Sequence, residues 1–164
     1  MQSLARNFPR NSSEKDRQYR DPKAIFQQAR AAGFTVVEDK DSFQIIIPGA
    51  RAFASGDDQI LPELVAPLRN IAELALEHRL AVDIEGHTDD KPISHGRFAS
   101  NWELSTARAI SVLRLFLGLG VPNSMLSASG RAEFAPVASN ATEDGRALNR
   151  RIVLLVKPSA AGRR

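Results

Sequence analysis

The sequence lacks cysteine altogether, which excludes disulfide bonds and metal sites built from thiolates but leaves the redox compartment open. It also lacks any run of about 18 consecutive apolar residues, the length that a membrane-spanning helix requires. Its first 20 residues are polar and lack the apolar centre of a secretory signal. As written, the chain is therefore expected neither to export nor to anchor itself. If it works outside the cytoplasm, we expect it to be a fragment of a longer protein.

Neither sign of charge dominates, because 22 lysines and arginines stand against 19 aspartates and glutamates, although the isoelectric point is near 9.7. Much of the basic excess lies in residues 1–23 and at Arg163 and Arg164. Such tails are usually solvated, and attraction to a polyanionic wall or an anionic membrane surface is the alternative. Nucleic-acid binding is disfavoured because the basic residues are not interleaved with aromatic residues along one element.

Hydrophobic periodicity predicts alternating helices and strands, and 43% apolar residues in 164 are enough for one core. The strongest helix start is the S-x-x-E pattern of Ser100 and Glu103. The expected elements are a helix over 22–32 capped by Asp21, a hairpin of 34–38 and 42–47, a helix over 57–79, a strand over 80–85, a helix over 101–117, and strands over 126–129 and 151–157. This order predicts an α+β fold, a two-layer sandwich with a βαβαβ core and a mixed sheet covered by helices on one face.

The chain is expected to divide into a flexible basic arm over 1–20, a single domain over 21–158 and a basic tail over 159–164. Two segments, 88–99 and 131–149, are too long and too polar to be simple connections, and we expect function to reside there.

Three polar clusters flank the predicted elements, at 86–90, 100–109 and 145–151. On the predicted helix, Asn101, Leu104 and Arg108 are spaced by three and four residues and therefore share one stripe. Asp89 follows a strand end, where polar groups of α/β layers commonly meet at a ligand crevice. A carboxylate and a guanidinium close together match a zwitterion such as the end group of an amino acid. The alternative is that Asp89 and Arg108 pair with each other or cap backbone groups, and spacing does not decide between these.

These clusters resemble a known family. The run GHTD at 86–89, the pattern N-x-x-L-S-x-x-R-A at 101–109 and G-R-x-x-N-R-R at 145–151 resemble the signature of OmpA-like peptidoglycan-binding domains. The longer forms GHTDDKPI and FASNWELSTARA are similar to flagellar stator proteins of the MotB type. The resemblance covers residues from about 24 to 157.

The resemblance implies non-catalytic binding of peptidoglycan, with Asp89 and Arg108 holding the zwitterionic end of diaminopimelate in the stem peptide. The other positions that match the motif are Thr88, Asn101, Leu104, Arg150 and Arg151. Which of the two arginines faces the ligand stays open, and both could instead form an exposed strand start paired with nearby acids.

The resemblance also implies a biological setting. The domain would anchor the flagellar motor stator, an ion-channel complex, to the wall from the periplasm, as part of a homodimeric protein held in the inner membrane by a segment absent from this chain. Its partner would be a MotA-like stator subunit. The alternatives are a generic OmpA-like wall anchor of another envelope complex and an extracytoplasmic protein-interaction module.

Catalysis and metal binding are disfavoured. His87, Asp89 and Asp90, with Ser94 and His95, supply the ingredients of a hydrolase, but no spaced motif predicts a nucleophile beside an oriented base. The same residues would place zinc ligands across a strand end and a flexible loop. We therefore expect no enzymatic activity, no cofactor and no metal.

Two further expectations concern residues near these motifs. Trp102 is interpreted as a packing residue at the layer edge rather than as a sugar-stacking residue. Gly86, Gly130 and Gly145 are expected to provide backbone conformations with positive φ rather than ligand contacts.

Overall fold

The computed structural model describes residues 23–93 and 96–159. The elements in chain order are α3 Ala24–Ala31, β1 Thr35–Glu38, β2 Phe43–Pro48, α4 Gly49–Ala52, α5 Pro62–Glu77, β3 Leu80–His87, α6 Asn101–Gly118, the 3₁₀ turn η1 Asn123–Met125, β4 Leu126–Gly130, α7 Glu143–Asn149 and β5 Arg151–Pro158. The predicted arm over 1–20, the cap at Asp21 and residues 160–164 of the predicted tail lie outside the described residues. No helix within 23–93 or 96–159 is long and apolar enough to cross a membrane.

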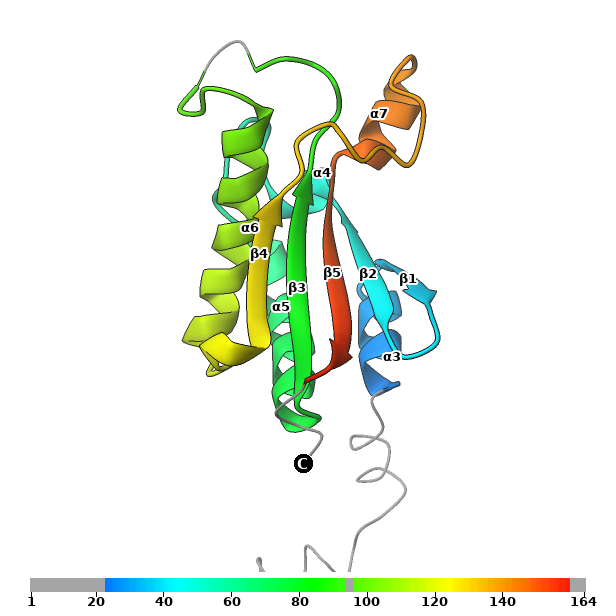
Figure 1. Cartoon of the computed structure of the whole chain (residues 1–164), viewed down its shortest axis with the longest axis vertical. Helices are drawn as coiled ribbons and strands as arrows, with labels where there is room; N and C mark the ends of the chain where they lie inside the picture. Colours follow the sequence, from blue (N-terminus) through cyan, green and yellow to red (C-terminus); the bar gives the residue numbers. More distant parts are fainter. Residues whose placement is uncertain (1–22, 94–95, 160–164) are drawn as a thin grey trace, which may run out of the picture.

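The five strands form one mixed sheet in the order β1-β2-β5-β3-β4, as Figure 1 shows. β1, β2, β5 and β3 pair antiparallel with their neighbours, whereas β3 and β4 are parallel. A parallel pair requires a crossover, and α6 supplies it. The predicted α+β class and mixed sheet are confirmed, and so are the hairpin and the helix that follows Ser100.

The core lies between one face of the sheet and the helices α3, α5 and α6. Because alternate residues of a strand share a face, the inward residues are regularly spaced on each of the three central strands. The fully buried set includes Ile45, Ile47, Val82, Ile84, Leu154 and Val156 from the strands and Ile25, Leu68, Ile71, Val112 and Phe116 from the helices. This packing fixes α6 against β3 and β4, so the start of α6 lies near the end of β3.

The helix predicted over 57–79 begins later, at Pro62, and the prediction of its start was wrong. Asp57 instead closes a turn, since its Oδ1 accepts from the backbone N–H of Asp58 at 2.7 Å and of Gln59 at 3.3 Å. Pro62 suits the first turn, where its missing N–H has no partner to lose. The helix is continuous through Pro67.

The segment 131–149 was predicted as a loop, but it contains α7. The helix begins at the N-cap Thr142, whose hydroxyl accepts from the N–H of Gly145 at 3.1 Å, and Glu143 and Asp144 follow in its first turn. The low helix propensity of Gly145 and Asn149 concealed these signals in the sequence. The single turn α4 was also not predicted.

The predicted positive φ at three glycines was wrong, because the glycines with positive φ in the described residues are Gly33, Gly56, Gly96 and Gly120. Gly86 serves close approach instead, since a Cβ there would collide with the backbone carbonyl of Ser105 on α6. Gly130 and Gly145 are equally crowded. The absent side chains of Gly86 and Gly130 let α6 pack against the end of the sheet, whereas that of Gly145 lets α7 pack against the carbonyl of Ser139.

Candidate functional site

A cleft of about 670 Å³ lies at the carboxyl end of β3. It is bounded by the α4 region, the segment after β3, the first turns of α6 and the residue that precedes β5. The lining residues are Gly49, Ala50, Phe53, Ser55, Gly56, Thr88, Asp89, Lys91, Pro92, Ile93, Gly96, Asn101, Leu104, Arg108 and Arg150. The cleft therefore contains six of the seven residues predicted from the motifs, and Arg151 is the exception.

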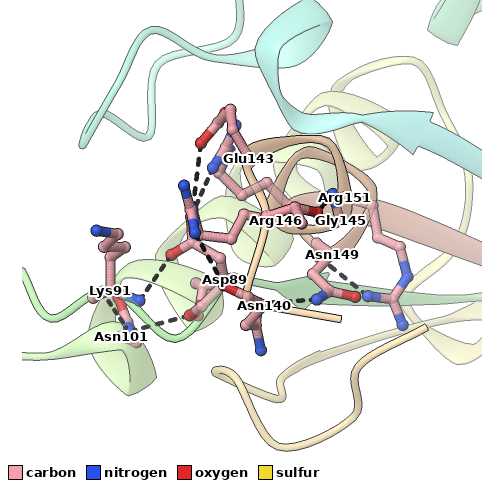
Figure 2. Close-up of polar contacts among 12 residues, drawn as sticks. Asp89, Lys91, Asn101, Asn140, Glu143, Gly145, Arg146, Asn149 and Arg151 are labelled. Carbon is pink, nitrogen blue, oxygen red and sulfur yellow. Dashed lines mark hydrogen bonds and ion pairs between the residues drawn. The ribbon is translucent and has the colours of Figure 1, made fainter. Parts of the chain in front are cut away.

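Asp89 lies two residues after β3 and is 7% exposed. Its Oδ1 accepts from the backbone N–H of Lys91 at 3.0 Å, and its Oδ2 accepts from Nη1 of Arg150 at 2.6 Å. Asn101 at the start of α6 holds the same turn, because its Nδ2 donates to the carbonyl of Lys91 at 3.0 Å (Figure 2). The carboxylate is thus fixed in position with one cationic partner.

Arg108 is 8% exposed and lies about two turns after Asn101 along α6. Its Nε donates to the carbonyl of Asp57 at 2.7 Å, and its Nη2 donates to the carbonyl of Ala54 at 3.1 Å. The guanidinium carbon lies 5.0 Å from the ring centroid of Phe53. Burial lowers the pKa of Arg108 from its usual value, and the nearby carboxylates of Asp57 and Asp58 oppose that shift. The guanidinium stays charged, since arginine is not deprotonated in proteins.

Asp89 and Arg108 do not pair with each other. The salt-bridge partner of Asp89 is Arg150, whereas Arg108 donates to two backbone carbonyls. The alternative that Arg108 caps backbone groups therefore holds for two of its three side-chain nitrogens, Nε and Nη2. Within the described part of the chain, its Nη1 makes no hydrogen bond that meets the usual geometric limits. Arg108 lines the cleft with donor capacity to spare.

The two adjacent arginines have different environments. Arg150 lines the cleft, and its Nη2 also donates to Glu143 Oε2 at 2.5 Å. The hydrogen bond to Glu143 has the largest effect and raises the pKa of Arg150; burial opposes it, and the hydrogen bond to Asp89 raises the pKa further. Arg151 is 6% exposed and donates to the carbonyls of Asn149 and Ala135 at 3.0 and 2.9 Å. Figure 2 shows the Arg151 side chain beside Asn149.

Thr88 and Leu104 complete the predicted set. Thr88 is buried, its hydroxyl donates to the carbonyl of Asp89 at 2.8 Å, and its N–H donates to Ala132 O at 2.9 Å. Leu104 contributes a buried apolar surface. The motifs did not single out Lys91, which stands within the GHTDDKPI run. The wall formed by residues 49–56 carries no polar pattern that could have revealed it.

His87 stands next to the cleft but does not line it. Its Nε2 lies 3.1 Å from Glu85 Oε1, and its buried Nδ1 has no hydrogen-bond partner within the described residues. Burial and then the charge of Arg151 lower the pKa of His87, with Glu85 opposing. No group of three potential metal ligands occurs among residues 23–93 and 96–159. Ser94 and His95, considered for a hydrolase, lie outside the described residues.

Comparison with known proteins shows which family this chain resembles in sequence. The model of the OmpA family matches residues 52–150, which include the whole cleft except its α4 edge. Motility protein B of Bacillus subtilis is 39% identical over 123 residues, which are 71% of this chain and 46% of that protein. The chain spans about half the length of the first curated relatives it matches.

Solved structures agree with the sequence matches. The cell wall anchor of the type VI secretion system (T6SS) from Pseudomonas aeruginosa superposes with a TM-score of 0.77 at 31% identity, covering 86% of this chain and 99% of that one. The periplasmic domain of Helicobacter pylori MotB superposes with a TM-score of 0.69 at 25% identity, covering 77% and 89%. The fold is thus that of MotB periplasmic domains, and the chain belongs to the OmpA family.

Proposed function

We propose that this domain binds peptidoglycan without catalysis and that its cleft takes the zwitterionic end of diaminopimelate. The observation that carries the proposal is that Asp89 and Arg108 line one cleft without neutralising each other. The carboxylate of Asp89 would accept the ligand's ammonium, and Nη1 of Arg108 would donate to its carboxylate. Membership of the OmpA family and similarity to Motility protein B support this assignment.

The remaining side chains have defined parts in this proposal. Asn101 and Thr88 hold the backbone around Asp89, while Leu104 offers an apolar wall to the methylene chain of the ligand. Arg150 occupies Asp89 Oδ2 in the free domain, so an incoming ammonium must share or replace that bond. Because Glu143 also binds Arg150, the guanidinium can remain in place and donate to the ligand's carboxylate. Arg151 would act only by supporting the segment 131–149.

The proposed biological role is a periplasmic anchor that holds a flagellar motor stator to the wall. In this role the domain would belong to a homodimeric inner-membrane protein that works with a MotA-like subunit. The likeness to Motility protein B and to the Helicobacter pylori MotB domain supports it. Residues 1–20 and 159–164 are proposed as a basic arm and a basic tail flanking the binding domain at 21–158.

A second candidate is the wall anchor of another envelope complex. It is favoured by the likeness to the T6SS wall anchor, which covers nearly all of that chain with a TM-score above that of the Helicobacter pylori MotB domain. Grafting residues 21–158 in place of the wall-binding domain of a MotB protein would separate the two. Restored swimming supports the stator role, whereas wall binding without restored swimming favours another complex.

The binding proposal is tested by co-sedimentation with purified sacculi. Asp89→Asn keeps the acceptor for Lys91 but removes the charge, and Arg108→Lys replaces a fork of donors with a single point charge. Each change should weaken binding by about 2 kcal/mol, roughly thirtyfold. Two matched controls should bind normally: Arg114→Lys on the exposed side of α6, and Asp83→Asn on β3, whose carboxylate pairs with Lys157 of β5. Wild-type sedimentation by folded Asp89→Asn and Arg108→Lys proteins would disprove the site.

A further inference from the structure

Two aromatic side chains stack on the surface beside the cleft. The rings of Trp102 and Phe134, here called the aromatic pair, lie with centroids 5.1 Å apart and an interplanar angle of 24°. Trp102 is 50% exposed and Phe134 is 64% exposed. The packing expected of Trp102 is therefore only partial, since half of the indole faces solvent. Large exposed aromatic side chains of this kind commonly mark interaction sites.

The pair is held in place from both sides. Trp102 lies in the first turn of α6, and its backbone N–H donates to the N-cap hydroxyl of Ser100 at 3.1 Å. The chain just before Phe134 is tied to the same helix, because the N–H of Ala132 donates to the hydroxyl of Ser105 at 3.1 Å. Rigid aromatic rings lose little entropy when they bind a partner. The pair is thus a preformed apolar surface.

The pair lies at the end of the molecule that contains the cleft. Figure 1 shows that the β3 arrow points to one end of the sheet. The start of α6 and the segment after β4 both lie at that end. Trp102 directly follows Asn101, which lines the cleft and holds the turn of Asp89. A helix with its side chains is about 10–12 Å across, so side chains on two flanks of one turn are separated by roughly that distance.

We propose that the aromatic pair binds a sugar ring of the glycan strand whose stem peptide occupies the cleft. The inference rests on the proposed peptidoglycan binding. Diaminopimelate is joined to the sugar through two amino acids. Together with diaminopimelate these make three residues, which span about 10 Å when extended. The helix diameter of about 10–12 Å is the upper limit for the separation of two flanks of one turn, so this length is enough to reach from the cleft to the pair. The C–H groups on one face of a pyranose carry partial positive charge and complement the negative face of an aromatic ring.

The test compares two ligands, a disaccharide-tetrapeptide and the free tetrapeptide, by titration calorimetry with the full chain. Wild type should bind the disaccharide form about five- to tenfold more tightly, a gain in the range of one exposed aromatic contact. Trp102→Ala and Phe134→Leu should abolish that gain and leave binding of the free tetrapeptide unchanged. Val37→Ala, which truncates an exposed apolar side chain on β1, is the control and should retain the gain.

Fluorescence supplies an independent readout because Trp102 is the only tryptophan of the chain. The disaccharide form should shift or quench its emission, and the free tetrapeptide should not. Free tetrapeptide binding with no gain from the sugar, or a gain that survives in both variants, would overturn this inference alone. Failure of wild type to bind either ligand would overturn the proposed function as well. Variants that dissociate a dimer without losing the sugar gain would assign the pair to contacts between copies and refute the inference.

Discussion

Replacing each of the two neighbouring arginines in turn distinguishes a structural side chain from one that faces the ligand. Arg151→Ala removes the donors to the buried carbonyl of Asn149 at 3.0 Å and to the partly buried carbonyl of Ala135 at 2.9 Å. Arg150→Ala removes a side chain that is 34% exposed and pairs with Asp89 and Glu143. Both changes delete the same number of atoms and the same charge, so each variant is a control for the other.

The expected magnitudes differ because the environments differ. Leaving one buried and one partly buried carbonyl without donors costs on the order of 3 kcal/mol, after allowance for the guanidinium that no longer needs desolvation. For a domain of this size that lowers Tm by roughly 6–12 °C. The ion pairs of Arg150 are partly screened by solvent, so its removal should cost about 1 kcal/mol at most and lower Tm by roughly 2–4 °C. Binding should show the reverse order, with the loss at Arg150 about tenfold.

Thermal unfolding followed by circular dichroism measures the first contrast, and sacculus binding at a temperature where both variants are folded measures the second. Arg151→Met separates charge from packing, because it retains an apolar stem but supplies no donor. If Arg151→Ala unfolds like wild type and loses wall binding while Arg150→Ala binds normally, the assignment of the two side chains is wrong.

Two further predictions concern the frame around the cleft. Gly86→Ala should destabilise the domain by about 2–3 kcal/mol in urea unfolding, because its Cβ would meet the backbone of Ser105, which cannot move independently of α6. Gly118→Ala, with open space around the same atom, should be stabilising by about 0.5–1 kcal/mol, and equal losses at both positions would contradict the packing argument. Because burial and Arg151 lower the folded-state pKa of His87 below 6.5, the unfolded chain takes up a proton first. The free energy of unfolding should therefore fall as pH drops below about 6.5, and His87→Gln should reduce that slope in urea titrations at several pH values.

Some of the fold was determined locally and could be predicted. The helix after Ser100 has its cap, its acidic first turn and its apolar stripe within one stretch of chain, and the structure contains it over Asn101–Gly118. The hairpin of β1 and β2 is equally local. The start of α5 was misplaced because the side chain of Asp57 forms a turn there. The helix α7 was missed because the low helix propensity of Gly145 and Asn149 concealed its cap at Thr142.

The sequence by itself determined the residue types of the site and their attachment to particular elements: an acid after a strand, a stripe on a helix, and two arginines at the start of a strand. Only the tertiary structure decided which charges meet. Asp89 and Arg150 are 61 positions apart, and Arg108 reaches carbonyls more than 50 positions away. The tertiary structure also distinguished Arg150 from Arg151. Strand alternation points consecutive residues in opposite directions, but only the packing of the sheet decides that Arg150 is the one that faces the cleft. Periodicity records the face of an element, whereas the partner across a cleft depends on how the whole core packs.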